Sequence, residues 1–352
     1  MKKVAIIGTH GLPARYGGFE SLAEQLVESR SVEYTVFCSS CTSTNKKSHY
    51  KGAKLRYIPL KANGISSVLY DILSLCCAIR GYDAVLILGI SGCIFIPIFR
   101  LLSRARIITN IDGLEHRRAK WGLLARWFLR LSERLAVRFS HTVVADNKAI
   151  AEYVVQSYGI TPRVITYGGD NALCNIPLDK QCKILDNYGV TDGDFLLSIC
   201  RIEPENNCHL ILQAAAQSGQ KLLFIGNWNR SKYSRNLRAQ YANYKNIITL
   251  DAIYDNEVLY ALRRAASCYI HGHSAGGTNP SLVEAMFLCR AIVAYDVNYN
   301  RETTLGKALY FSNLEHLTSI LSEPLTENTE LKMAAEKHYL WDDIRALYES
   351  LY

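Results

Sequence analysis

The sequence predicts an α/β protein of two doubly wound, Rossmann-like domains that face each other across a cleft. The chain has 352 residues, of which 49% are hydrophobic and 20% charged, enough apolar material for two separate cores. Short apolar runs alternate with helical patterns through the first half, and the same alternation starts again at Phe195. Because such patterns form parallel sheets that bind ligands beyond their strand ends, we expect a ligand site between the domains.

Each element follows from this alternation in chain order. In the first domain, residues 1–170, strands are expected at 4–8, 34–39, 54–60, 84–89, 106–111 and 141–146, helices over 18–29 and 66–80, and a closing segment at 163–170. A polar linker covers 171–194. In the second domain, residues 195–329, strands are expected at 195–200, 221–226, 246–250, 266–272 and 291–296, with helices over 210–217 and 281–288. The last segment, 330–352, has a helical pattern and is expected to cross back to the first domain.

Composition argues against a secreted, membrane-spanning or metal-binding protein. The eleven cysteines are scattered and lie mostly in apolar stretches, as reduced thiols do in a cytoplasmic protein. No Cys-x-x-Cys pair or tight Cys/His cluster has the spacing of a zinc site. The longest uncharged run, 84–99, is shorter than the roughly 20 residues of a membrane-spanning helix. We therefore expect a cytoplasmic protein that uses no metal.

Positive charge is concentrated in one segment. Residues 100–140 contain ten basic and three acidic residues, in a chain whose net charge is +8. Within it, Arg126, Arg130, Arg134 and Arg138 recur every four residues and form a stripe along a helix. The stripe is either a solvated helix face or a surface for anionic lipid headgroups or a phosphate-bearing acceptor. Nucleic acid is not expected, because no aromatic-rich basic module accompanies the stripe.

A glycine-punctuated loop, residues 8–20, follows the first strand and opens a helix at Gly17 and Gly18. Backbone N–H groups at a helix start can bind phosphate, and glycine lets a ligand approach the main chain closely. The dinucleotide fingerprint G-x-G-x-x-G does not fit, which disfavours a nicotinamide dehydrogenase. The alternative is a tight turn without a ligand.

Two further loops follow strands of the second domain. Arg201 ends the first of these strands, where its planar guanidinium suits a diphosphate. The segment 271–286 has a small-residue loop whose amides can hold a diphosphate, and then a helix in which Glu284 can accept hydrogen bonds from ribose hydroxyls. His271 and His273 point the same way on the strand end, as metal ligands do, but the sequence offers no third ligand.

Four motifs, RIEPENN (201–207), GTNPSLVEAM (277–286), GLPARYGGFE (11–20) and NIDGLEHRRAKW (110–121), resemble glycosyltransferase family 4, retaining enzymes of the GT-B fold. The resemblance is closest to the bacterial branch that includes rhamnosyltransferases of O-antigen, capsule and wall-polysaccharide synthesis. It implies transfer of a sugar, first of all L-rhamnose from dTDP-rhamnose, from a nucleotide-diphosphate donor to a lipid-diphosphate-linked saccharide. It also implies no cofactor, and a position on the inner face of the cell membrane.

The resemblance assigns roles to residues at matching motif positions. The donor is expected to contact Gly17, Gly18, Arg201, Asn206, His273, Gly276, Gly277, Thr278, Asn279, Ser281 and Glu284. Catalytic roles fall on Arg201, Asp112 and Glu20. Residues facing the acceptor or the membrane are Glu115, Arg117, Arg118, Lys120, Arg126, Arg130 and Arg134.

Three positions depart from the family pattern. Asn206 replaces a lysine that binds the diphosphate, Gly276 replaces the first of two glutamates, and Ile111 replaces a histidine before Asp112. These changes put the donor sugar in question more than the reaction. They leave two alternatives open, namely a nucleotide-sugar epimerase of the same fold and a non-catalytic nucleotide-sugar-binding subunit.

Overall fold

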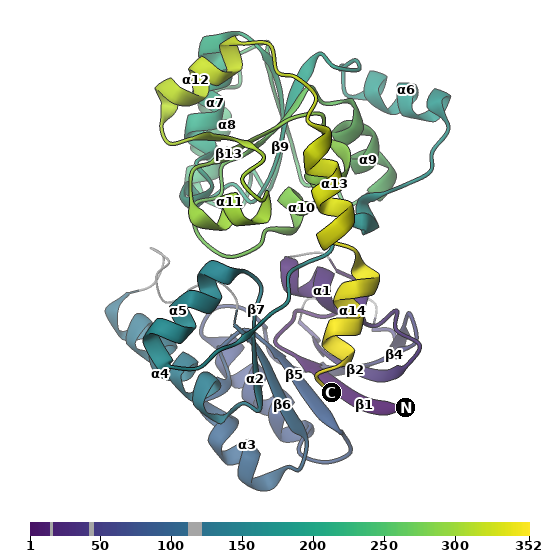
Figure 1. The fold of residues 1–352 in the computed structure, drawn as a ribbon, viewed down its shortest axis with the longest axis vertical. Coiled ribbons are helices and arrows are strands. Elements are labelled where there is room, and N and C mark those ends of the chain that lie inside the picture. The colour runs from purple at the N-terminus through teal and green to yellow at the C-terminus, as the bar shows by residue number, and fades with distance from the viewer. Residues whose placement is uncertain (15–16, 42–45, 112–121) are drawn as a thin grey trace. The chain divides into compact units, whose positions relative to one another are not determined.

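A computed structural model describes residues 1–14, 17–41, 46–111 and 122–352. The chain forms two compact units, one from Met1–Tyr167 with Asp342–Tyr352 and the other from Gly168–Trp341 (Figure 1). Each unit is an α/β domain with its own largely parallel sheet. The predicted fold class, two Rossmann-like domains, is therefore confirmed.

The sheet of the first unit has the strand order β3-β4-β2-β1-β5-β6-β7-β8. Its strands are β1 (Lys2–Ile7), β2 (Val32–Ser39), β3 (His49–Tyr50), β4 (Ala53–Ile58), β5 (Ala84–Leu88), β6 (Arg106–Ile111), β7 (Thr142–Ala145) and β8 (Arg163–Val164). All neighbouring strands are parallel except β3 and β4. The order reverses between β1 and β5, the position where doubly wound sheets open a crevice for ligands.

Helices link the strands of the first unit. They are α1 (Gly18–Leu26), α2 (Ser66–Cys77), η1 (Cys93–Phe95), α3 (Ile96–Leu102), α4 (Leu123–Phe139) and α5 (Lys148–Tyr158). The inner strands read as continuous apolar runs because helices cover both faces of the sheet: β5, with the sequence AVLIL, is buried along its whole length.

The second unit has the strand order β11-β10-β9-β12-β13-β14, all parallel. Its strands are β9 (Phe195–Ile199), β10 (Lys221–Ile225), β11 (Ile247–Leu250), β12 (Cys268–His271), β13 (Ile292–Tyr295) and β14 (Leu309–Phe311). This is the 3-2-1-4-5-6 order of a Rossmann fold, with its switch point between β9 and β12.

The helices of the second unit cover both faces of this sheet. They are η3 (Asp170–Ala172), α6 (Leu178–Asn187), η4 (Pro204–Asn206), α7 (Cys208–Ser218), α8 (Lys232–Gln240), α9 (Asn256–Ala265), α10 (Pro280–Leu288), α11 (Asn298–Thr303), α12 (Leu314–Ser322) and α13 (Thr329–His338).

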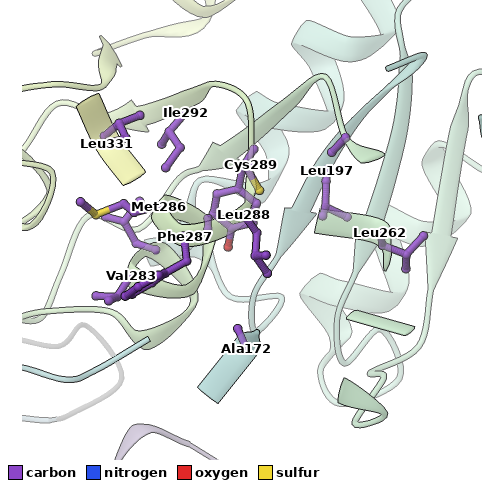
Figure 2. Packing of buried hydrophobic residues seen from close by; sticks show 14 of the residues in the cluster. Ala172, Leu197, Leu262, Val283, Met286, Phe287, Leu288, Cys289, Ile292 and Leu331 are labelled. Carbon is purple, nitrogen blue, oxygen red and sulfur yellow. The ribbon is translucent and has the colours of Figure 1, made fainter. Parts of the chain in front are cut away.

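Helix α10 lies in the centre of one of the apolar cores of the second unit. Val283, Met286, Phe287 and Leu288 of this helix are buried and pack among apolar side chains of neighbouring elements (Figure 2). The helix is apolar on most sides, which is typical of a buried helix. Glu284, whose side chain is 18% exposed, therefore belongs to a helix that the core packs tightly on most sides.

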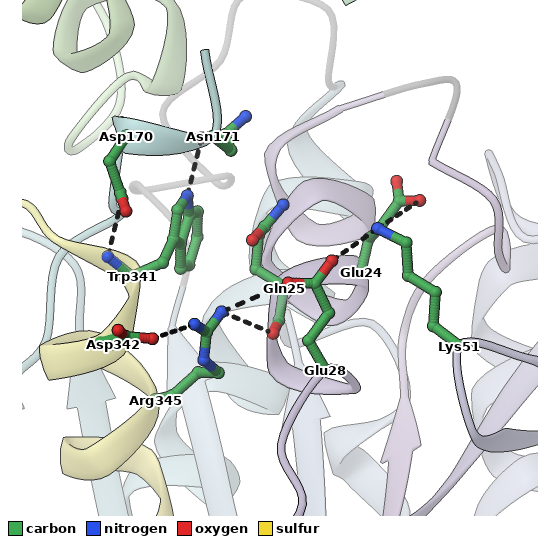
Figure 3. A network of polar contacts seen from close by, with 9 residues as sticks. All are labelled: Glu24, Gln25, Glu28, Lys51, Asp170, Asn171, Trp341, Asp342 and Arg345. Carbon is green, nitrogen blue, oxygen red and sulfur yellow. Dashed lines mark hydrogen bonds and ion pairs between the residues drawn. The ribbon is translucent and has the colours of Figure 1, made fainter. Parts of the chain in front are cut away.

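Helix α14 (Trp341–Glu349) begins in the second unit and continues in the first. In the first unit, Tyr348 is fully buried and its hydroxyl accepts a hydrogen bond from Asn110 Nδ2 at 2.7 Å. The Arg345 guanidinium contacts the Gln25 carbonyl at 3.3 Å and the Glu28 carboxylate at 3.6 Å (Figure 3).

Three segments differ from the sequence expectations. The expected linker, 171–194, contains η3 and α6 and is part of the second unit, because Leu185 of α6 is buried in its core. The closing segment of the first domain contains only the two-residue strand β8. The helical pattern over 330–352 forms two helices, α13 and α14. No helix in the described part of the chain has the length and apolarity needed to span a membrane.

Candidate functional site

The candidate site of the second unit is formed by two loops at its topological switch point. One loop follows β9 and contains Arg201, and the other joins β12 to α10. The two strands are neighbours in the sheet, so their carboxyl ends lie side by side. Ligands of doubly wound sheets bind at such a position.

Arg201 is the cationic group of the first loop. Its side chain is 31% exposed, and its Nη1 lies 4.0 Å from a Glu203 carboxylate oxygen. This distance is too long for a hydrogen bond. The guanidinium therefore keeps donors for a ligand.

Asn206, at the position where the family pattern has a lysine, makes hydrogen bonds to both loops. The residue is 2% exposed, and its Nδ2 donates a hydrogen bond to the Arg201 carbonyl at 2.6 Å. A carbonyl only accepts hydrogen bonds, so the opposite end of the amide, Oδ1, faces His273 Nδ1. Asn206 thus joins the two loops from within, and its expected contact with the donor stays a prediction.

The protonation of His273 follows from this contact. Because Asn206 Oδ1 is an acceptor, His273 Nδ1 carries the proton and donates. His273 Nε2 lies 2.9 Å from the place that a Cβ atom on Gly276 would occupy. The ring fills the space beside residue 276, where the family pattern has a glutamate. Gly276 also has a φ of +129°, which disfavours any other residue.

Further hydrogen bonds join the two loops into one body. The Ser274 N–H and hydroxyl both donate to the Glu205 carbonyl, at 2.9 and 2.7 Å. Asn207 Nδ2 donates to the Gly272 carbonyl at 2.9 Å, and Asn300 Nδ2 to the His273 carbonyl at 2.9 Å. These hydrogen bonds constrain the geometry of the loops, and a fixed arrangement of donors favours electrostatic stabilisation of an anion.

The second loop ends at the N-terminus of α10. Asn279 is the N-cap and its Oδ1 accepts a hydrogen bond from the Ser281 N–H at 3.0 Å. Gly277 and Thr278 are buried just before it, and Ser281 is half-buried. The helix start and the glycine loop together present N–H groups at the positive end of the helix dipole, where anions bind.

Glu284 is held from two sides by residues that the sequence analysis did not single out. Arg263 of α9, 3% exposed, donates through Nη2 to Glu284 Oε2, and Asn171 Nδ2 lies 3.4 Å from Oε1. The sequence offered one hint for Arg263, because it directly follows the apolar Ala261 and Leu262. Asn171 had no such signal, since it lies 113 residues before Glu284.

His271, which the sequence offered as a possible metal ligand, is a buried residue at the end of β12. It is 2% exposed, and burial lowers its pKa to about 3, so the ring is neutral. It stacks on Tyr269 with ring centroids 6.0 Å apart. Among the described residues, no three His, Cys, Asp or Glu side chains are grouped so as to hold a metal ion.

In the first unit, Gly17 is the N-cap of α1 and Gly18 its first residue. Glu20 lies in the first turn of this helix, is 4% exposed, and accepts a hydrogen bond from the His10 N–H at 2.7 Å. Its carboxylate thus holds the glycine loop in place. The sequence indicated only a catalytic role for Glu20 and not this structural one.

The remaining predicted residues belong to the segment around α4. Asp112, Glu115, Arg117, Arg118 and Lys120 lie outside the described residues. On α4, Arg130 and Arg134 are exposed, whereas Arg126 is half-buried, so the basic stripe is narrower than expected. Three apolar side chains at the start of the helix are also exposed: Leu123 by 84%, Leu124 by 86% and Trp127 by 66%.

Two family models match parts of the chain. The model described as Domain of unknown function (DUF1972) matches residues 1–170. The model described as Glycosyl transferases group 1 matches residues 184–306, which include both loops and Glu284. No curated protein matches the chain.

Solved structures share the whole architecture at low sequence identity. Sucrose-phosphate synthase from Thermosynechococcus elongatus has a TM-score of 0.82 at 16% identity, and 100% of this chain and 98% of that chain are covered. Anabaena HepE in complex with UDP-glucose has a TM-score of 0.77 at 15% identity, with 100% and 99% covered. The catalytic domain of starch synthase IV from Arabidopsis thaliana, bound to ADP and acarbose, has a TM-score of 0.71 at 12% identity, with 99% and 98% covered.

The chain has the GT-B fold of these solved structures, and residues 184–306 match the family model of glycosyl transferases group 1. Its second unit contains the glycosyl transferases group 1 domain, and the two joined loops lie within it.

Proposed function

We propose that this protein is a retaining glycosyltransferase that moves a sugar from a nucleotide-diphosphate donor to a lipid-diphosphate-linked saccharide in surface polysaccharide synthesis. L-Rhamnose from dTDP-rhamnose is the first sugar to test. The observation that carries the proposal is the rigid pair of loops at the switch point, with Arg201 on one loop, the start of α10 on the other, and Glu284 one turn further on.

The chemistry required is stabilisation of a departing nucleoside diphosphate. As the bond from the anomeric carbon to the phosphate oxygen breaks, negative charge grows on the diphosphate. The Arg201 guanidinium and the N–H groups of residues 276–279 supply fixed positive charge and donors for it, in the absence of a metal ion. Glu284 accepts hydrogen bonds from the nucleotide's sugar.

Retention of configuration follows if the acceptor hydroxyl attacks from the face that the diphosphate leaves. A donor phosphate oxygen then takes the acceptor proton, so no side chain needs to act as the base. Asp112, Glu20 and Glu115 orient sugar or acceptor hydroxyls in this proposal.

We further propose that α4 holds the protein on the inner face of the cell membrane. Exposed Arg130 and Arg134 supply charge for anionic headgroups. Leu123, Leu124 and Trp127, all strongly exposed at the start of the helix, supply apolar side chains that enter the interface between headgroups and acyl chains.

The transfer reaction is tested by product mass spectrometry with a panel of UDP-sugars and dTDP-sugars and a short lipid-diphosphate saccharide. The expected product is the acceptor plus one sugar, with the anomeric configuration of the donor retained in its NMR spectrum. Each donor is also incubated without acceptor. An epimer formed there identifies an epimerase, and tight nucleotide binding without transfer or donor hydrolysis identifies a binding subunit.

A further inference from the structure

A chain of polar contacts leads from Glu284 to the end of the second unit. Arg263 Nη2 donates to one carboxylate oxygen, and Asn171 Nδ2 lies 3.4 Å from the other. The indole N–H of Trp341 donates to Asn171 Oδ1 at 2.7 Å. The four residues belong to α10, α9, η3 and the first position of α14.

The chemistry of the groups fixes the direction of each contact. An indole N–H only donates, so the Asn171 atom that faces Trp341 is the carbonyl oxygen. The NH₂ group of Asn171 then points toward Glu284, whose ionised carboxylate only accepts. Trp341 thus selects the orientation of Asn171 that presents donors to Glu284. The opposite orientation would place two oxygens against each other.

Close packing holds Trp341 and Asn171 in place. Trp341 is 2% exposed, and a Cβ atom on Gly168 would lie 2.6 Å from its ring. A Cβ atom on Gly169 would lie 2.7 Å from Val283 of α10. The backbone N–H of Trp341 also donates to Asp170 Oδ1 at 2.8 Å (Figure 3). At positions 168 and 169, between Trp341 and α10, only glycine fits without a steric clash. The backbone just before Asn171 is therefore tightly constrained.

The same residues lie where the polypeptide passes between the two units. The chain enters the second unit at Gly168 and leaves it after Trp341. The two passing segments are hydrogen-bonded to each other, since the Gly169 N–H donates to the Tyr339 carbonyl at 2.9 Å. The series of polar contacts from Glu284 therefore ends at Trp341 and Asn171, next to the two points where the polypeptide changes unit.

We propose that Asn171 is a positioning residue for nucleotide recognition and that Trp341 anchors it. Asn171 and Arg263 hold the Glu284 carboxylate from opposite oxygens, so that its remaining lone pairs face the hydroxyls of the nucleotide's sugar. This inference rests on the proposed function, because it assigns the nucleotide's sugar to Glu284. Its consequence is that nucleotide binding changes the environment of Trp341, the last residue of the second unit.

Calorimetric titration of UDP into the purified full-length chain tests this proposal. We expect Asn171→Ala to raise the Kd for UDP about three- to tenfold, because one hydrogen bond to the carboxylate is lost. Trp341→Phe keeps the ring against Gly168 and removes only the N–H, and it should raise the Kd in the same direction. The double variant should be no weaker than Asn171→Ala alone, because both changes break one pathway.

A spectroscopic signature separates positioning from general stability. The indole N–H resonance of Trp341, assigned by its loss in Trp341→Phe, should shift when UDP is added to wild type. The shift should be absent in Asn171→Ala. As a matched control, Trp228→Phe removes another buried indole N–H of the same unit, which donates to the Phe224 carbonyl at 3.3 Å. It should leave the Kd unchanged even where it lowers the unfolding temperature.

The outcomes distinguish this inference from the proposed function. Folded Asn171→Ala and Trp341→Phe with a wild-type Kd overturn the inference if Glu284→Gln still weakens UDP binding, and the proposed function then stands. Additive effects of the two substitutions also overturn it. If wild type binds no nucleoside diphosphate, both proposals fall.

Discussion

At the scale of single residues, buried polar groups decide the chemistry of both units. Asp71 of α2 is 5% exposed, and burial raises the pKa of its carboxyl to about 8, although a hydrogen bond from the Gly92 backbone opposes this rise. The carboxyl is therefore protonated in the folded protein at neutral pH. Nothing in the sequence around Asp71 marks it as different from an exposed acid.

The buried Asp71 gives a pH-dependent stability with a defined sign. The folded pKa, about 8, is above the ordinary value of 3.8, so the folded state binds the proton more tightly. Its contribution is present at low pH and is lost as pH rises from about 4 toward 8, at up to about 1.4 kcal/mol per pH unit. Asp71→Asn removes the titration. Relative to wild type, this variant should be more stable at pH 8 than at pH 5 in urea unfolding.

Exposed Asp83→Asn in the same unit is the control for Asp71→Asn, and its stability relative to wild type should differ little between the two pH values. If Asp71→Asn gives the same pH dependence as wild type, the Asp71 carboxyl is ionised in the folded protein and this account is wrong.

At the scale of elements, the sequence predicted helices and strands where a regular period continues over several residues. The helix expected over 281–288 is α10, and the strand expected over 195–200 is β9. The basic stripe of α4 was predicted from its four-residue spacing, but a spacing of four drifts around a helix. Arg126 is therefore half-buried while Arg130 and Arg134 are exposed. The exposed apolar group at the start of α4 was not predicted, because exposure depends on what packs against the helix.

Helix α4 gives a prediction about membrane binding. Arg130→Glu with Arg134→Glu should weaken binding to phosphatidylglycerol vesicles about thirtyfold or more at low salt, since each basic residue contributes about 1 kcal/mol. Leu123, Leu124 and Trp127 changed together to Ser should weaken binding at high salt as well, because apolar insertion is not screened. Vesicle co-sedimentation measures both effects.

The control for α4 is Lys332→Glu with Lys337→Glu on α13, two exposed positions that change the net charge equally. If the α13 control releases the protein as completely as the α4 variants do, net charge and not α4 determines binding.

At the scale of the whole molecule, sequence neighbours belong to different units. Tyr339 and Tyr348 are nine residues apart, yet the Tyr339 hydroxyl donates to the Thr303 carbonyl at 2.8 Å in the second unit, and Tyr348 is fully buried in the first. The boundary between the two units therefore falls inside the helical pattern over 330–352, and no residue type in the sequence indicates where it lies.

This division predicts different effects of two similar substitutions. Tyr348→Ala should destabilise the first unit by about 3–5 kcal/mol, the usual cost of removing a large buried ring. Hydrogen exchange measured by mass spectrometry should show lost protection in β1 and β6 with α13 unchanged. Tyr339→Ala, its matched partner, should lower protection in the second unit and leave β1 and β6 as in wild type. A Tyr348→Ala protein that loses protection mainly in the second sheet would contradict the assignment of α14.

The sequence by itself determined the α/β class, the restart at Phe195, the loop that contains Arg201 and the helix that contains Glu284, because hydrophobic period and loop composition are local properties. Only the tertiary structure decided what those residues contact. Asn206 joins two loops, His273 fills the space beside Gly276, and Glu284 is held between Arg263 and Asn171. Trp341 reaches Asn171 across 170 residues of sequence. Such contacts depend on how the sheet brings distant segments together, and that arrangement leaves no periodic signal in the chain.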